Sequence, residues 1–177
     1  RLGSGDLSDY DAAILAPTNF IQYQPPGADY HEGDESPLDV TLAQVDRHPE
    51  DQPVLIYEGW ADMGDYGFPP DRRAERRYHA ENRGDYHDWH VDYLAELRAA
   101  RPDRTFGLIP VAPVLSELLT GPLQGLEPEL FYVDDAPHGT EDTYALAALV
   151  VHASLFGEVG HPWLFLLGTQ KMEKYLQ

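Results

Sequence analysis

Three short apolar runs, separated by helical patterns, constrain the fold of this chain more than any other feature. They span residues 10–16, 53–57 and 105–111, and each has the length and apolar character of a buried strand. Strands that alternate with helices are typical of a parallel sheet covered by helices on both faces. We therefore predict an α/β fold: a three-layer α/β/α arrangement with a mostly parallel sheet, formed by a single domain over residues 1–177.

Helices are predicted between these runs from their end signals and their apolar spacing. Residues 37–45 follow Ser36, which can cap the first turn, and begin with a proline, which the first turn of a helix tolerates. Residues 85–100 repeat apolar side chains every three or four positions, as an amphipathic helix does. Residues 112–119 are predicted to form a shorter helix.

The last predicted helix, residues 140–156, is apolar on nearly all sides, so we expect it to be largely buried. Gly157 ends it, and the tail over residues 158–177 is expected to pack on the domain or on a partner. The segment 71–83 can bind an anionic substrate, although a solvated helix face is the interpretation we favour. It holds most of the positive charge of the chain, on Arg72, Arg73, Arg76 and Arg77.

Charge and cysteine content exclude several classes of function. The chain has 31 acidic and 12 basic residues and a formal net charge of -19, so its surface repels nucleic acids and anionic membranes. We therefore predict no nucleic-acid partner and no membrane association. Because the chain has no cysteine, disulfides, thiolate catalysis and cysteine-ligated metals are excluded.

A carboxylate and a histidine share a tight loop ahead of the last predicted helix. Asp135 stands three residues before His138, Pro137 restricts the backbone before the ring, and Gly139 permits a sharp bend after it. A general base needs a fixed imidazole with a carboxylate beside it, which steadies the charge that the ring acquires. We predict this role for His138, oriented by Asp135; the alternative is a loop that contains both residues by chance.

Polar and aromatic residues also follow the first two predicted strands. Asn19 can donate to a developing oxyanion, or it can simply form a turn through its own backbone. Glu58 and Trp60 can line a cleft, where a tryptophan face suits a sugar, or they can be a surface acid and a core ring. Because the carboxyl ends of parallel strands meet at one edge of a sheet, we expect these residues and His138 to form one site.

A pair of histidines on the predicted helix over residues 85–100 raises a metal site as an alternative. His87 and His90 are three residues apart, with Asp88 and Asp92 nearby, and such a set can hold a transition metal. No matched third ligand accompanies them, so a surface or half-buried helix is the interpretation we favour. We predict neither a metal nor a cofactor.

Several of these residues resemble known motifs. The stretch Asp135-Ala-Pro-His138 resembles the closing D-x-x-H block of SGNH/GDSL-type hydrolases, and residues 17–19 after the first strand resemble their G-x-N-D block. Residues 57–60 are similar to a Y-E-x-W signature of one bacterial subgroup. The resemblance covers most of residues 7–157 and implies ester hydrolysis by a serine, with His138 as the base, Asp135 orienting it and Asn19 in the oxyanion hole.

The nucleophile block of such hydrolases does not stand in this chain. Residues 5–8, Gly-Asp-Leu-Ser, match it in letters only, because no apolar strand precedes them, and this makes Ser8 and Ser4 weak candidates. We therefore expect that the sheet lacks its first strands. A missing N-terminal segment or a partner chain would then complete the sheet and supply the serine, since the first apolar run would otherwise expose a bare edge.

The leading functional hypothesis is an SGNH-type ester hydrolase that acts on acyl esters, acetyl esters of carbohydrate among them. The alternative is a catalytically inactive SGNH-like binding or assembly module, and a third hypothesis is a metal-dependent hydrolase that uses the histidine and aspartate clusters. The acidic composition is compatible with a salty or secreted setting, which slightly favours a periplasmic or extracellular bacterial protein.

Overall fold

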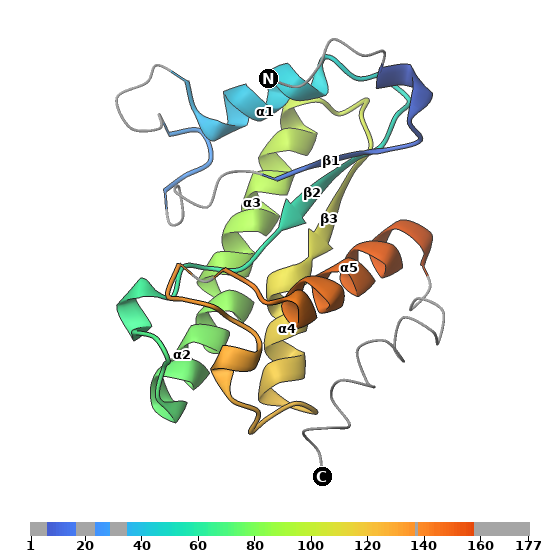
Figure 1. Ribbon diagram of the computed structural model, residues 1–177. Helices are drawn as coiled ribbons and strands as arrows, with labels where there is room; N and C mark the ends of the chain where they lie inside the picture. Colours follow the sequence, from blue (N-terminus) through green and yellow to red (C-terminus); the bar gives the residue numbers. More distant parts are fainter. Residues whose placement is uncertain (1–6, 17–23, 29–34, 137, 158–177) are drawn as a thin grey trace. The chain divides into compact units, whose positions relative to one another are not determined.

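The computed structural model describes residues 7–16, 24–28, 35–136 and 138–157 (Figure 1). Its internal contacts divide the chain into two compact units. The sheet unit consists of Arg1–Gly59 and Asp85–Ile109, and the helical unit consists of Trp60–Gly84 and Pro110–Gln177. Each unit is therefore built from segments that are separated in the sequence.

The sheet unit contains three strands in the order β1-β2-β3. β1 (Ala13–Leu15) runs parallel to β2 (Val54–Glu58), with Ala13 opposite Val54, and β3 (Phe106–Pro110) lies on the other side of β2 (Figure 1). All three predicted strands are thus confirmed, within one or a few residues of their predicted limits. Among the described strands, β1 is at an edge of the sheet, with β2 as its neighbour.

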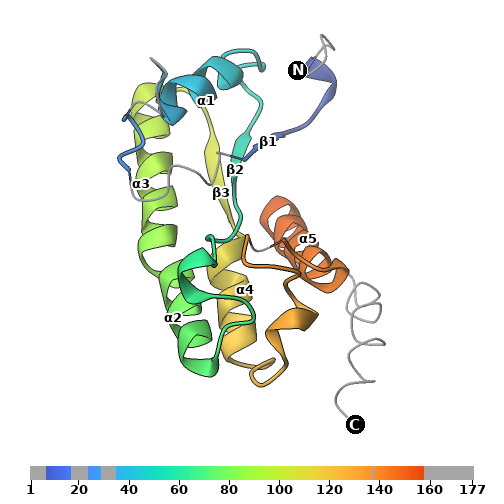
Figure 2. The same ribbon diagram turned by 60° about the vertical axis from the view of Figure 1, so that its left-hand side comes forward.

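Two helices of the sheet unit pack on the sheet from one side (Figure 2). They are α1 (Pro37–Val45), capped by Ser36, and α3 (Asp85–Ala100), and both have the limits that the sequence predicts. A short 3-10 turn, η1 (Leu7–Asp9), precedes β1. The core between the helices and the sheet is apolar, with Ala13, Val45, Val54, Ile56, Tyr93, Leu94, Leu97 and Phe106 as its buried members.

The helical unit is organised around α4, which packs against both α2 and α5 (Figure 1). Its helices are α2 (Arg72–Arg83), α4 (Val111–Thr120) and α5 (Glu141–Phe156). A short 3-10 turn, η3 (Gly64–Tyr66), precedes α2, and another, η4 (Pro128–Leu130), lies between α4 and α5. The predicted ends of α5 are confirmed: the side chain of Thr140 caps its first turn, and Gly157 adopts a left-handed φ of 68° after its last residue.

The prediction that α5 is largely buried is wrong. Its buried residues are Thr143, Ala147 and Val150, whereas Tyr144 is 53% exposed and Phe156 is 66% exposed. These buried positions follow helical spacing, so α5 buries a single stripe. An apolar sequence shows that a helix can be buried on every side, but the number of neighbours that pack around it is decided by the fold.

The α/β class is therefore established, with a small parallel sheet and helices between its strands. Within the sheet unit itself, the described helices cover one face of that sheet (Figure 2). No helix in the described part of the chain has both the length and the apolar character that a membrane span needs.

Candidate active site

The loop that carries His138 is closed by backbone hydrogen bonds on both sides of the ring. The amide of Val133 donates to the carbonyl of His138 over 2.8 Å, and the amide of Thr140 donates to the carbonyl of Phe131 over 2.9 Å. Tyr132 and Gly139 form an antiparallel bridge between these two bonds. His138 thus lies in a narrow, pinned turn directly before α5, which agrees with the rigid corner that the sequence predicts.

The imidazole of His138 is held by the carboxylate of Asp134. Its Nδ1 lies 2.7 Å from Oδ2 of Asp134, and the other oxygen, Oδ1, accepts the backbone amides of His138 and Ala136 over 3.0 and 3.1 Å. The hydrogen bonds from the side chain and backbone of His138 lower the pKa of Asp134, so it stays ionised near neutral pH. With Nδ1 engaged, Nε2 of this exposed ring is the nitrogen available to a substrate.

The carboxylate that contacts the ring is therefore not the predicted one. Asp135, expected to orient His138, has an exposed side chain, and its backbone carbonyl accepts the amide of Met63 over 3.0 Å. The reason is local geometry: Asp134 accepts amides two and four residues ahead of it, and this turn brings its second oxygen to the ring. Asp135 instead fastens the loop to the segment before η3 through its backbone.

Trp60 lies against the same loop. Its ring is 6.4 Å from that of Tyr132 and 5.9 Å from that of Tyr144. A Cβ atom added to Gly139 would stand 3.2 Å from Cζ2 of Trp60, so the close approach of ring and backbone favours glycine after His138. The half-buried Trp60 and the exposed Tyr144 therefore form an aromatic surface beside the His138 turn.

Glu58 has a different environment from the one the sequence suggests. It ends β2 in the sheet unit, its side chain is 0% exposed, and its two oxygens lie 2.9 and 3.1 Å from Nδ1 of His87. Burial raises the pKa of Glu58 to about 7, although the hydrogen bond from His87 opposes the shift. A carboxylate so enclosed does not line a cleft, and its partner could not be inferred because 29 residues separate the pair.

The remaining predicted residues lie mostly outside the described part of the chain. Asn19 and Ser4 are among the residues that the structure does not describe, and the side chain of Ser8 is not described either. Three other serines have described side chains, each with a partner of its own. Ser36 caps α1, Ser116 contacts His79, and Ser154 donates to the carbonyl of Val150.

The contact between Ser116 and His79 resembles a nucleophile and its base, but its surroundings argue against that role. Oγ of Ser116 lies 3.1 Å from Nδ1 of His79, and both residues are 2% exposed. Burial lowers the pKa of His79 to about 4, so the ring is neutral at neutral pH. Because both side chains are closed to solvent, this pair joins α2 to α4 and does not offer a hydroxyl to a substrate.

The two histidines considered as metal ligands are each hydrogen-bonded to protein groups. His87 contacts Glu58, and Nδ1 of the buried His90 lies 2.9 Å from the carbonyl of Tyr86. Across the described ranges, no three histidine, aspartate or glutamate side chains are grouped so that they could hold a metal ion. His87 therefore connects α3 to β2, and His90 bonds to the first turn of α3 itself.

The described groups thus provide one accessible arrangement for proton transfer, the Asp134–His138 pair, with Trp60 and Tyr144 beside it. Comparison with known proteins found no family model, no curated protein and no solved structure that matches this chain.

Proposed function

We propose that this protein hydrolyses acyl esters, with His138 as the general base and Asp134 as the residue that orients it. The observation that carries the proposal is the 2.7 Å contact between Nδ1 of His138 and Oδ2 of Asp134 on a pinned, exposed turn. It fixes the ring, directs Nε2 outward and places an ionised carboxylate where the imidazole becomes positive. The resemblance of this loop to the closing block of SGNH-type hydrolases supports His138 as the base, although the aspartate that contacts the ring is Asp134 and not Asp135.

In this reaction a serine hydroxyl attacks the ester carbonyl carbon and passes its proton to Nε2 of His138. The tetrahedral intermediate collapses to an acyl-enzyme, and the alcohol leaves with that proton. A water molecule then repeats the sequence and releases the carboxylic acid. Asn19 is proposed to donate its amide to the oxyanion, and Asp134 stays ionised throughout.

The nucleophile is proposed to come from outside the described residues, because Ser36, Ser116 and Ser154 are engaged elsewhere. Separately, in the described part of the sheet unit, the outer edge of β1 pairs with no further strand. A further strand paired there, from a partner chain or from another segment of the protein, would extend the sheet towards the three-layer SGNH-type fold. Such pairing would also cover Ile14, which is 43% exposed.

The proposed substrate is a small acyl ester of a carbohydrate, such as an acetate. Trp60 and Tyr144 support this choice, because a flat aromatic surface beside the catalytic loop can pack against a sugar ring. Glu58 is no longer part of the proposed substrate contact, since its carboxylate is buried against His87.

The experiment that tests the proposal is the hydrolysis of a chromogenic acetate ester by the full protein and by His138→Ala. Loss of the base should lower kcat by about 1,000-fold or more, because a triad member contributes at least that much in serine hydrolases. His87→Asn serves as the control, since this histidine belongs to the sheet unit and contacts Glu58. Turnover that survives His138→Ala would refute the assignment of the base.

The second candidate function is a binding or assembly module without catalysis. The engagement of each serine hydroxyl described above favours it, because none of these serines contacts His138. This candidate predicts no ester turnover by the full protein, but binding of an acetylated sugar that Trp60→Ala weakens. Only the first candidate function predicts ester turnover, whereas both predict that the aromatic surface of Trp60 and Tyr144 contacts the ligand.

A further inference from the structure

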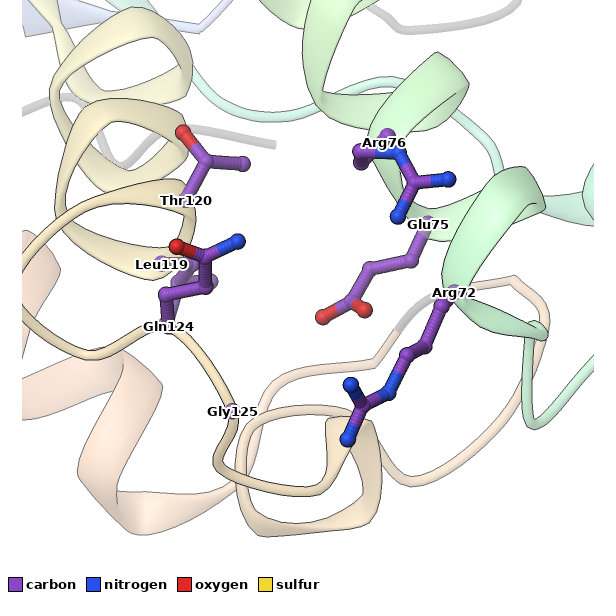
Figure 3. Close-up of a pocket in the computed structure, with 7 residues that line it drawn as sticks. All are labelled: Arg72, Glu75, Arg76, Leu119, Thr120, Gln124 and Gly125. Carbon is purple, nitrogen blue, oxygen red and sulfur yellow. The ribbon is translucent and has the colours of Figure 1, made fainter.

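The helical unit contains a cavity of about 70 Å³ between α2 and the C-terminal end of α4 (Figure 3). A single water needs roughly 10–15 Å³ of such volume, so the cavity has room for a ligand of a few non-hydrogen atoms. None of its lining residues belongs to the His138 loop. The lining consists of Arg72, Glu75, Arg76, Leu119, Thr120, Gln124 and Gly125.

Two arginines on α2 give the cavity its charge. Arg72 and Arg76 are four residues apart, so they project from the same face of the helix. Figure 3 shows their guanidinium groups on one side of the cavity, with the carboxylate of Glu75 between them. Among the lining residues, two positive charges face one negative charge, although the whole chain has a net charge of -19.

The opposite wall is polar without being charged. Figure 3 shows the carboxamide of Gln124 facing the cavity across from the two arginines. The hydroxyl of Thr120 is already used, because it donates to the carbonyl of Ser116 over 2.6 Å and accepts from Arg83 over 3.0 Å. The donors that a ligand meets are therefore guanidinium and amide N–H groups.

We propose that this cavity binds a small oxyanion, a carboxylate or a phosphate, between Arg72, Arg76 and the amide of Gln124. Planar guanidinium groups match the oxygens of such anions and form strong charge-assisted hydrogen bonds with them. The site is separate from the His138 turn, and the proposal does not depend on ester hydrolysis. The arginine-rich face of α2, interpreted from the sequence as solvated, would then bind a ligand.

The charge of Glu75 affects the affinity of this cavity for an anion. Burial is the main cause that raises its pKa, Glu127 adds to the rise, and Arg72 and Arg76 oppose it. Burial raises the pKa of the Tyr132 phenol, and the charge of Glu75 adds to that rise. An anion between the arginines repels the carboxylate, so its binding and the protonation of Glu75 should favour each other.

The test is a titration of the full protein with inorganic phosphate and, separately, with acetate, at constant ionic strength, followed by calorimetry or by amide chemical shifts. We expect saturable binding of one equivalent of at least one of the two anions, and the comparison identifies which. Arg76→Gln should weaken binding by about 10-fold, since it removes charge-assisted hydrogen bonds. Arg73→Gln is the matched control, because it removes the same charge from the same helix but does not line the cavity.

Glu75→Gln provides the second arm of the test. Removal of the negative charge should strengthen binding of either anion at pH 7, because the carboxylate of Glu75 repels an anion held between the two arginines. Equal losses in Arg73→Gln and Arg76→Gln, or no saturable binding of either anion, would overturn the proposal. Weaker binding of the anion in Glu75→Gln would also overturn it. Saturable binding of glycine, used as a probe, would then identify the cavity as a site for zwitterions.

Discussion

The orientation of the His138 ring depends on a single carboxylate, and two adjacent aspartates compete for that role in the sequence. Spacing alone favours Asp135, because three residues before a histidine is a familiar separation. The structure selects Asp134, whose first oxygen accepts two backbone amides and whose second oxygen reaches Nδ1 of the ring. The proposed catalytic role therefore makes different predictions for two neighbouring residues of the same type.

Asp134→Asn should lower kcat for a chromogenic acetate ester by about 100-fold or more, because an amide cannot steady the imidazolium and can select the wrong tautomer. Asp135→Asn is the matched control and should leave kcat within about three-fold, since its side chain is exposed and its contribution to the loop is a backbone carbonyl. Equal losses in the two variants would contradict the assignment, and so would a larger loss in Asp135→Asn.

Glu58 is the second residue whose behaviour follows from its surroundings. Its pKa rises from the ordinary 4.5 to about 7 in the folded protein, because burial disfavours the carboxylate. A raised pKa contributes stability that is fully present below pH 4.5 and is lost as the pH rises through 7. The ionised form therefore destabilises the sheet unit in mildly alkaline solution.

Glu58→Gln should change the free energy of unfolding differently at the two ends of this range. The free energy of unfolding of the variant, relative to that of the unmodified protein, should be on the order of 2 kcal/mol higher at about pH 8 than at about pH 5. The reason is that one pKa unit corresponds to about 1.4 kcal/mol. Urea denaturation at both pH values measures the difference. A Glu58→Gln difference that is independent of pH would contradict the prediction.

At the scale of elements, α5 begins where the His138 loop ends, and Thr140 contributes to both. Its hydroxyl accepts the amide of Thr143 and donates to the carbonyl of Leu130 over 2.7 Å, and its own amide donates to Phe131. The helix cap and the closure of the His138 turn therefore share one residue. The sequence predicts that Thr140 caps α5, whereas its hydrogen bond to the carbonyl of Leu130 forms only because the loop folds back on the segment before it.

Thr140→Ala should lower the free energy of unfolding by about 1–2 kcal/mol, a typical cost for a lost N-cap, and should also reduce ester turnover by loosening the turn. Thr140→Ser keeps the hydroxyl and should restore most of both properties. Thermal or urea denaturation measures the first effect, and steady-state kinetics measures the second. If Thr140→Ala lowers stability while Thr140→Ser does not recover it, the hydroxyl is not the cause.

At the scale of the whole molecule, each unit contains a buried neutral histidine. His79 lies in the helical unit and His90 in the sheet unit, and burial lowers the pKa of each from the ordinary 6.5 to about 4. A lowered histidine pKa contributes stability that is present above pH 6.5 and is lost as the pH falls through 4. Both units should therefore lose stability in acid for the same reason.

The double variant His79→Gln and His90→Gln should show a smaller loss of unfolding free energy between pH 7 and pH 5 than the unmodified protein. The expected difference is on the order of 2 kcal/mol, and each single variant should account for part of it. Chemical denaturation across this range measures the slope, so a uniform loss of stability does not affect the conclusion. A slope in the double variant that equals that of the unmodified protein would contradict the prediction.

Local sequence signals determined much of the secondary structure. The limits of α1 and α3, the cap of α5 and the three strands follow from periodicity, capping residues and turn residues, which act within a few positions of the chain. The position of His138 in a tight turn directly before α5 could also be predicted, because proline and glycine flank the ring and Thr140 can cap the helix that follows. No local pattern in the sequence predicts the division of the chain into two compact units, because each unit combines segments that are distant in the sequence.

Long-range packing decided the rest. No spacing rule shows that Glu58 would be buried against His87, that α5 would pack along one stripe, or that Arg72 and Arg76 would face a cavity closed by α4. Even the choice between Asp134 and Asp135 depends on how the turn closes. By itself, then, the sequence determined where helices and strands form and which chemical groups are available, whereas the tertiary structure decided which groups meet, because burial and partner choice depend on residues that are distant along the chain.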